Sequence, residues 1–320
     1  MKKHAIVLLL IVLAVLAGCL AGALGLRQPT ANGDACRLYL PDGTSRDALC
    51  DTLVADGVLH STTAFRLMAS LLRLDEVRPG SYVVEPHMRT LSLVRKLRNG
   101  QQDPIRLTIG QFRLPQDLND YLGQKLMHDT FDVSLSTFHL VLPDTYEVYW
   151  TVTPEAFMQR MEREYNTFWR GVKGSEKVAK ESERREITIL ASIVEEETNY
   201  GPEKPLIASV YLNRLRRGMP LQADPTVKYA VGDFTLRRIL NRHLGVESPF
   251  NTYLHAGLPP APICLPSKAT IKAVLNAPET QYLYFCASPA MDGTHRFAAT
   301  LAEHNRNAAA FHRALDSRTR

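Results

Sequence analysis

The chain has 320 residues, of which 45% are hydrophobic and 22% charged, with 18 glycines and 19 prolines. This composition is typical of a globular protein and excludes a disordered, a collagen-like or a multi-span membrane chain. The formal net charge is +5, but Lys2, Lys3 and Arg27 supply three of those charges, so the rest of the chain is nearly neutral. A near-neutral body offers no basic surface for nucleic acid, and we expect no nucleic-acid partner.

The N-terminal segment is strongly apolar. From Ala5 to Leu26 the chain runs for 22 residues without a charge, directly after two lysines and a histidine. A helix that crosses a bilayer needs about 20 apolar residues, and lysines before it orient the remainder outward. We therefore predict a transmembrane anchor in residues 1–30. Two alternatives stay open, a cleaved signal peptide and a lipidated Cys19 after the lipobox-like Leu16-Ala17-Gly18. All three export the rest of the chain.

The four cysteines beyond Cys19 allow two interpretations. Disulfides between Cys36 and Cys50 and between Cys264 and Cys286 would each close a local loop, and an exported protein permits them. The alternative is four unpaired thiols. The sequence has no CxxC pair and no metal-ligand spacing, so we expect neither a metal nor another cofactor.

Residues 34–101 read as a small α+β module. Its predicted elements are a strand from Cys36, a helix capped by Ser45, a helix over Thr62–Leu74, a strand in RPGSYVVEP and a short helix over Leu91–Leu97. Residues 102–182 are a linking region with weaker patterning. There we predict a strand at IRLTI, an amphipathic helix over Met158–Phe168 and a solvated charge run from Glu176 to Glu186 that enters a helix.

Residues 183–320 carry the candidate chemistry, beginning with three consecutive glutamates. On a helical wheel for EITILASIVEEETNY, Glu197 falls within about 20° of Leu190, in the middle of the apolar stripe. Glu195 and Glu196 fall well off that stripe. Asn199 and Gly201-Pro202 end the helix directly afterwards, so the carboxyl of Glu197 lies at the negative end of the helix dipole. Desolvation and the dipole both predict a raised pKa, as a general acid near neutral pH requires.

The same pattern has a purely structural interpretation. Glu197 could reach solvent at a fraying helix end, or it could pair with a core arginine such as Arg214. The wheel alone does not identify an enzyme.

The following segments favour a functional site. LQADPT is a polar turn, and Ser248–Ser267 is a proline-rich loop that presents Asn251, Thr252 and Tyr253 from a stiff backbone. YLYF and GTHRFA then form a β-hairpin, and a striped helix follows from Leu301.

In that order, ASIVEEET, PLIASVYLNRLRRGMPLQADPTVKYA, SPFNTYLHAGLPPAPI, YLYF and GTHRFAATLAEHN resemble the endolytic murein transglycosylase (YceG-like) family. The resemblance is dense over residues 187–305 and patchy over 102–182, mainly at LPDTYEVY. It is weaker over 34–101, which resembles the family's LysM-like glycan-binding module. It implies an α+β fold with a transmembrane helix, a LysM-like module and a mixed helix and β-hairpin catalytic domain. It also implies an inner-membrane protein whose catalytic domain lies in the periplasm.

The resemblance implies lytic cleavage of the β-1,4 bond between N-acetylmuramic acid (MurNAc) and N-acetylglucosamine (GlcNAc) in peptidoglycan. The products are 1,6-anhydro ends, which would terminate nascent glycan strands, and peptidoglycan synthases are candidate partners. The second glutamate of the family's E-x-E pattern falls on Glu197, the residue that the wheel selects. This chain has Glu196 where relatives often have lysine, which predicts a still higher pKa for Glu197.

Further site residues are matched to the family's motifs. Gln222 and Asp224 match Q-x-D-P-T and are expected to hold the sugar or stabilise positive charge, unless Asp224 only caps a turn. Asn251 and Tyr253 match N-T-Y and are candidate glycan contacts, unless the loop only packs on itself. Glu195 is a candidate orienting carboxylate, although its wheel position favours the surface. His304 reads as structural and His295 stays open.

Three hypotheses therefore remain. The first is a lytic transglycosylase, and the second is a hydrolase of the same glycan in which Asp224 activates water for Glu197. The third is a non-catalytic peptidoglycan-binding protein of the cell envelope. The sequence contains no GxSxG, HExxH or phosphate-loop motif that would favour another enzyme class.

Overall fold

The structure is a computed structural model that describes residues 6–7, 10–19, 29–236 and 238–318. Helices and three two-stranded sheets make up these ranges, which confirms the predicted α+β class. Ten of the 22 residues of the predicted membrane span, Ala5 to Leu26, lie outside the described residues. Among those that are described, no helix has both the length and the apolar character needed to cross a membrane.

The chain divides into two compact units. The first comprises residues 1–107, 124–128 and 147–153, and the second comprises 108–123, 129–146 and 154–320. The four-part division drawn from the sequence stays a prediction.

The first unit contains an antiparallel sheet of β1 (Cys36–Leu40) and β2 (Gly80–Val84) that packs with the helices α2 (Arg46–Ala55), α3 (Thr63–Leu71) and α4 (Thr90–Arg98). Their order along the chain is β1, α2, α3, β2 and α4. β1 and β2 pair with Leu38 opposite Tyr82, and both side chains enter a core made with the apolar faces of the helices. Ser45 caps α2 by accepting the backbone N–H of Ala48, as its position predicted.

A second sheet joins β3 (Ile105–Ile109) to β4 (Asp144–Val148). The predicted strand at IRLTI is confirmed, and its residues alternate between buried and exposed. α5 (Pro115–Lys125) and α6 (Pro154–Gly171) follow β3 and β4 in turn. α6 extends beyond the predicted Met158–Phe168, because Pro154 can occupy a first helical turn and a buried side chain recurs every fourth position as far as Trp169.

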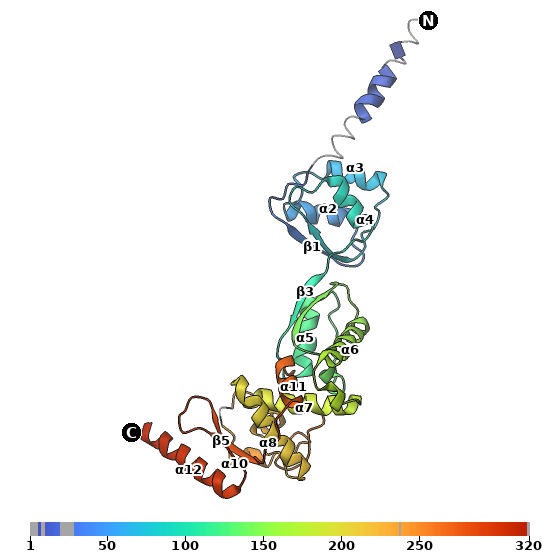
Figure 1. The fold of residues 1–320 in the computed structure, drawn as a ribbon. Coiled ribbons are helices and arrows are strands. Elements are labelled where there is room, and N and C mark those ends of the chain that lie inside the picture. Colours follow the sequence, from blue (N-terminus) through green and yellow to red (C-terminus); the bar gives the residue numbers. More distant parts are fainter. Residues whose placement is uncertain (1–5, 8–9, 20–28, 237, 319–320) are drawn as a thin grey trace. The chain divides into compact units, whose positions relative to one another are not determined.

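The second unit is built around α7 (Glu181–Glu197), which packs against α8 (Lys204–Arg216) and α11 (Lys268–Leu275) (Figure 1). Every residue from Thr188 to Val194 is buried, so α7 is enclosed on all sides over these turns. A helix of this kind has no solvent face for a helical wheel to find. The helix ends at Glu197, and a short 3₁₀ turn over Gly201–Glu203 leads into α8.

The rest of the second unit supplies the loops and the hairpin around the end of α7. α9 (Asp224–Val231) and α10 (Asn241–Leu244) precede the proline-rich loop, and residues 248–267 contain no helix or strand. The predicted hairpin is confirmed with strands two residues later than expected, β5 (Tyr284–Ala287) and β6 (His295–Ala298). α12 (Leu301–Arg318) packs against both strands.

The four cysteines whose pairing the sequence left open are all unpaired thiols. Cys50 and Cys264 are buried, and Cys36 and Cys286 are half-buried. This favours the thiol interpretation over the two disulfides.

Candidate active site

The carboxyl group of Glu197 lies at the C-terminal end of α7, half-buried, where Tyr211 of α8 reaches it. The Tyr211 hydroxyl donates a hydrogen bond of 3.2 Å to Oε2 of Glu197. Burial, and after it the negative charge of Asp224, raises the pKa of Glu197 to about 7, although the Tyr211 hydrogen bond and Lys228 act in the opposite direction. A carboxyl group with this pKa holds its proton in a large fraction of molecules at neutral pH, as a general acid must.

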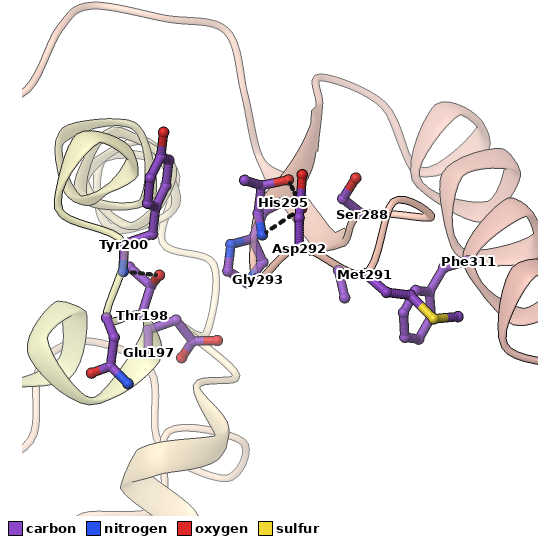
Figure 2. Close-up of a pocket in the computed structure, with 12 residues that line it drawn as sticks. Glu197, Thr198, Tyr200, Ser288, Met291, Asp292, Gly293, His295 and Phe311 are labelled. Atoms are coloured by element: carbon purple, nitrogen blue, oxygen red, sulfur yellow. Dashed lines mark hydrogen bonds between the residues drawn. The ribbon is translucent and has the colours of Figure 1, made fainter.

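Glu197 lines two cavities of the second unit. The larger has a volume of about 640 Å³ and lies between the end of α7 and the β5–β6 hairpin. Figure 2 shows Glu197, Thr198 and Tyr200 on one side of it and hairpin residues such as Met291 and His295 on the other. The smaller has a volume of about 280 Å³ and is lined by Glu197, Tyr211, Arg214, Leu221, Gln222, Asp224, Tyr253, Phe285 and His304. One ionisable side chain therefore borders both cavities.

Asp224 and Tyr253 meet in the smaller cavity. The Tyr253 hydroxyl donates a hydrogen bond of 2.7 Å to Oδ1 of Asp224, which is the first residue of α9. The positive end of a helix dipole favours a carboxylate at that position. Asp224 is exposed, so its negative charge is available to a ligand in this cavity.

Backbone hydrogen bonds tie the polar turn to the proline-rich loop. The backbone N–H of Gln222 donates to the carbonyl of Thr252 at 3.1 Å, and the N–H of Ala223 donates to the Thr252 hydroxyl at 3.1 Å. The Thr252 and Thr226 hydroxyls lie 2.8 Å apart. Gln222 has a left-handed backbone with a φ of 50°. These contacts bring the predicted residues Gln222, Asp224 and Tyr253 together, although the motifs that contain them are more than 20 residues apart.

Asn251 does not face either cavity. Its side chain is fully buried, and its amide nitrogen donates to the carbonyls of Leu244 and Val246, both at 2.9 Å. Its amide oxygen accepts the backbone N–H of Tyr253 at 3.0 Å. The expected direct contact with a glycan is therefore corrected: Asn251 holds the loop that carries Tyr253.

Glu195 is not a surface residue, contrary to its position on the wheel. Its side chain is only 9% exposed and forms an ion pair of 3.0 Å with Lys204. Burial alone would raise the pKa of Glu195, but hydrogen bonds from Thr270, Lys204 and Ser267 outweigh burial and hold that pKa below its usual value. Lys204 of α8 and Ser267, directly before α11, cover this side of α7, so the off-stripe position of Glu195 is buried as well. Glu195 lines neither of the two cavities that Glu197 borders.

Glu196 does not act on Glu197 as the sequence suggested. Arg113 donates to both of its carboxylate oxygens, at 2.9 to 3.1 Å. The pKa of Glu197 is instead raised by burial and by Asp224. The predicted direction of the shift is confirmed and its predicted cause at Glu196 is corrected.

Several residues near the site differ from what the sequence suggested. Arg214 does not pair with Glu197, because its guanidinium donates to the carbonyls of Leu283 and Leu221, both at 2.7 Å. His304 stacks on Tyr284, with ring centroids 5.4 Å apart, which agrees with the structural role predicted for it. It also lines the smaller cavity. The sequence did not predict Tyr211 as a site residue. The one signal for it was its place on α8, the helix that directly follows the helix of Glu197.

A metal site is not part of this arrangement. Within the described ranges, no three His, Cys, Asp or Glu side chains are grouped as metal ligands. The chemistry that the side chains themselves offer is proton transfer by Glu197 beside the carboxylate of Asp224.

The model of the YceG-like family matches residues 38–310. The chain belongs to this family.

Three curated relatives carry the name endolytic murein transglycosylase. The protein from Bacillus subtilis (strain 168) is 27% identical over 308 residues, which cover 84% of this chain and 82% of that protein. The protein from Streptococcus pneumoniae serotype 2 (strain D39) is 24% identical over 321 residues, which cover 84% of this chain and 57% of that protein. A crystal structure of a yceG-like protein from Listeria monocytogenes matches 86% of this chain and 99% of that one, with 25% identity and a TM-score of 0.49.

Proposed function

We propose that this chain is an endolytic peptidoglycan lytic transglycosylase. It cleaves the β-1,4 bond between MurNAc and GlcNAc and leaves a 1,6-anhydroMurNAc end. The observation that carries this proposal is the carboxyl group of Glu197, with a pKa of about 7, at the border of two cavities. Membership of the YceG-like family and the names of the curated relatives support the substrate and the type of reaction.

The reaction needs one group that gives a proton and then takes one. Glu197 protonates the glycosidic oxygen as the bond from that oxygen to C1 of MurNAc breaks, and GlcNAc leaves with a new hydroxyl. The carboxylate formed then accepts the proton of the C6 hydroxyl of MurNAc, while O6 bonds to C1. Glu197 ends protonated, so no water is consumed. The sugar's own hydroxyl replaces the nucleophile for which most glycosidases need a second carboxylate.

Asp224 supports this reaction by its charge. The transition state carries positive charge at C1 and the ring oxygen, and a carboxylate at the smaller cavity stabilises it. The hydrogen bond from Tyr253 fixes the orientation of the Asp224 carboxylate. Gln222 is exposed in the same cavity and supplies an amide for a sugar hydroxyl or acetamido group.

A second candidate is hydrolysis of the same bond. It is favoured by one observation, namely that Glu197 shares a cavity with the carboxylate of Asp224, which could activate a water molecule. Mass spectrometry of purified glycan strands after digestion separates the two reactions. The lytic reaction leaves anhydro ends, and hydrolysis leaves reducing ends heavier by one water. We expect anhydro ends from the unaltered chain and from Asp224→Asn at a lower rate. Reducing ends from the unaltered chain would establish the hydrolase instead.

We further propose that the enzyme works outside the cytoplasm, anchored in the inner membrane by a single N-terminal span. The apolar run from Ala5 to Leu26 and the lysines before it support this setting. The strand–helix–helix–strand order of the first unit supports a LysM-like glycan-binding module. In that setting the enzyme would terminate nascent strands beside a peptidoglycan synthase. Fractionation of cells tests the anchor, since removal of residues 1–30 should release the protein from membranes.

A further inference from the structure

His295 and Glu203 form a pair at the larger cavity that the reaction above does not use. Nδ1 of His295 lies 2.8 Å from Oε2 of Glu203, and the side chains are 15% and 13% exposed. The backbone N–H of His295 donates to the same carboxylate, at 3.0 Å to Oε1 and 3.1 Å to Oε2. Glu203 therefore holds both the main chain and the ring of His295 at the start of β6.

This pairing fixes which ring nitrogen carries the proton. An ionised carboxylate can only accept hydrogen bonds, so Nδ1 of His295 must be the donor to Glu203. In the neutral ring, Nε2 is then left with a lone pair and acts as an acceptor. The His295 ring also packs against Phe285 in a T-shaped pair with centroids 5.4 Å apart, which restricts its rotation.

The remaining nitrogen is available to a ligand. Within the part of the chain that the structure describes, Nε2 has no hydrogen-bond partner, and it is not enclosed by protein. His295 lines the 640 Å³ cavity that Glu197 also lines, and Figure 2 shows the two side chains on facing sides of it. A fixed acceptor thus stands opposite the proposed acid.

We propose that His295 is a substrate-contacting residue, whose Nε2 accepts a hydrogen bond from a hydroxyl or acetamido N–H of the hexosamine bound in the larger cavity. Glu203 is its positioning residue. This inference rests on the proposed function for the identity of the sugar. It assigns the larger cavity to a saccharide unit next to the bond that is cleaved, whereas Asp224 and Tyr253 hold the unit in the smaller cavity.

A purely structural pair would behave differently when Glu203 becomes glutamine. In Glu203→Gln the amide oxygen still accepts the backbone N–H of His295, so the hairpin stays attached. With the amide oxygen at the position of Oε1, the amide nitrogen takes the position of Oε2 and donates to Nδ1, which moves the ring proton to Nε2 and turns the acceptor into a donor. A structural role predicts no change in cleavage for this variant, whereas a substrate contact predicts a loss.

The test combines kinetics with ¹⁵N NMR of the histidine ring in the full chain. On uncross-linked peptidoglycan strands, we expect Glu203→Gln and His295→Phe each to lower kcat/KM about tenfold, mainly by raising KM, at an assay temperature well below the Tm of either variant. Glu303→Gln is the matched control, because Glu303 also accepts a backbone N–H, from Ala299, but lines neither cavity. The His295 ring should show a protonated Nδ1 in the unaltered chain and a protonated Nε2 in Glu203→Gln.

Full kcat/KM in both variants, or a protonated Nε2 in the unaltered chain, would overturn the inference. If the unaltered chain cleaves no strands, the proposed function fails and the ring resonance decides this inference separately. Strands added to Glu197→Gln should shift the Nε2 resonance of His295, and an unmoved resonance would refute the contact.

Discussion

The hydroxyl of Tyr211 lies 3.2 Å from Oε2 of Glu197 and donates a hydrogen bond to it. This donor favours the carboxylate form and so lowers the pKa of Glu197, against burial and the charge of Asp224, which raise it. The value of about 7 is therefore a balance that the residues around Glu197 set. Changes to any of these residues should move the pH range in which the enzyme works.

The pH dependence of cleavage follows from the protonated form of Glu197. Because the reaction begins with proton donation, kcat/KM should fall about tenfold per pH unit above a pKa near 7. Initial rates on purified glycan strands across the neutral range measure this, with circular dichroism to confirm that the fold persists. A rate that stays constant for two units above neutrality would show that another group supplies the proton.

Tyr211→Phe should shift the alkaline fall of kcat/KM to higher pH. Removal of the donor leaves burial and Asp224 to act with less opposition, so the pKa of Glu197 rises further and the acid form persists at higher pH. Tyr165→Phe is the matched control, since Tyr165 is also buried and its hydroxyl lies 3.3 Å from that of Thr188, yet it lines neither cavity. A shift to lower pH in Tyr211→Phe would contradict the assignment of the donor.

Glu197→Gln should stabilise the protein in a pH-dependent way. The folded state holds the Glu197 proton up to about pH 7, whereas the unfolded chain releases it near 4.5. Stability of the unaltered chain therefore declines as pH rises between these values, and it stays lower above them. The glutamine variant avoids this decline and should gain at most about 3 kcal/mol above neutrality, reduced by solvent that reaches the site through the cavities.

Urea unfolding at acidic and at mildly alkaline pH measures this difference. The gain should vanish below the ordinary pKa of a glutamate, where both states of the unaltered chain are protonated. Glu196→Gln is the control and should gain nothing at either pH. A Glu197→Gln variant that is less stable than the unaltered chain at alkaline pH would disagree with a raised pKa.

Replacing Glu195 by alanine should cost much more folding stability than replacing Glu196 by alanine. Glu195→Ala leaves Lys204, which is 13% exposed, without its ion-pair partner, and the loss of one member of a buried pair costs about 3 to 5 kcal/mol. Glu196→Ala breaks a pair with an Arg113 side chain that is 45% exposed, which costs up to about 1 kcal/mol. Thermal unfolding of the two variants compares the costs directly. Equal losses would mean that the wheel was correct and that Glu195 is a surface residue.

The sequence predicted those features of the site that depend on local periodicity. The helical repeat placed Glu197 on an apolar stripe, and its carboxyl is indeed shifted toward the protonated form. The same wheel was wrong for Glu195, because Lys204 and Ser267 from neighbouring segments cover the side of α7 that a wheel assigns to solvent. The hairpin was also predicted from local pattern. Its strands begin two residues later than predicted, because the sequence marks the ends of a strand only weakly.

Features that depend on distant contacts could not be predicted. Arg113 neutralises Glu196 across 83 residues of sequence, and Glu203 orients His295 across 92. Asn251 belongs to a motif that suggested a glycan contact, yet the fold uses its amide to hold backbone carbonyls. Residue type alone does not distinguish an amide that binds a sugar from one that holds a loop.

The rate at which Glu197→Gln cleaves purified glycan strands tests the central claim most directly, measured beside Glu196→Gln and the unaltered chain. Glutamine keeps the size of the side chain and removes the proton that it donates. We predict that Glu197→Gln produces no anhydro ends above background while remaining folded, and that Glu196→Gln retains most of the activity. Full cleavage by Glu197→Gln would contradict the account, because the proton would then come from another group.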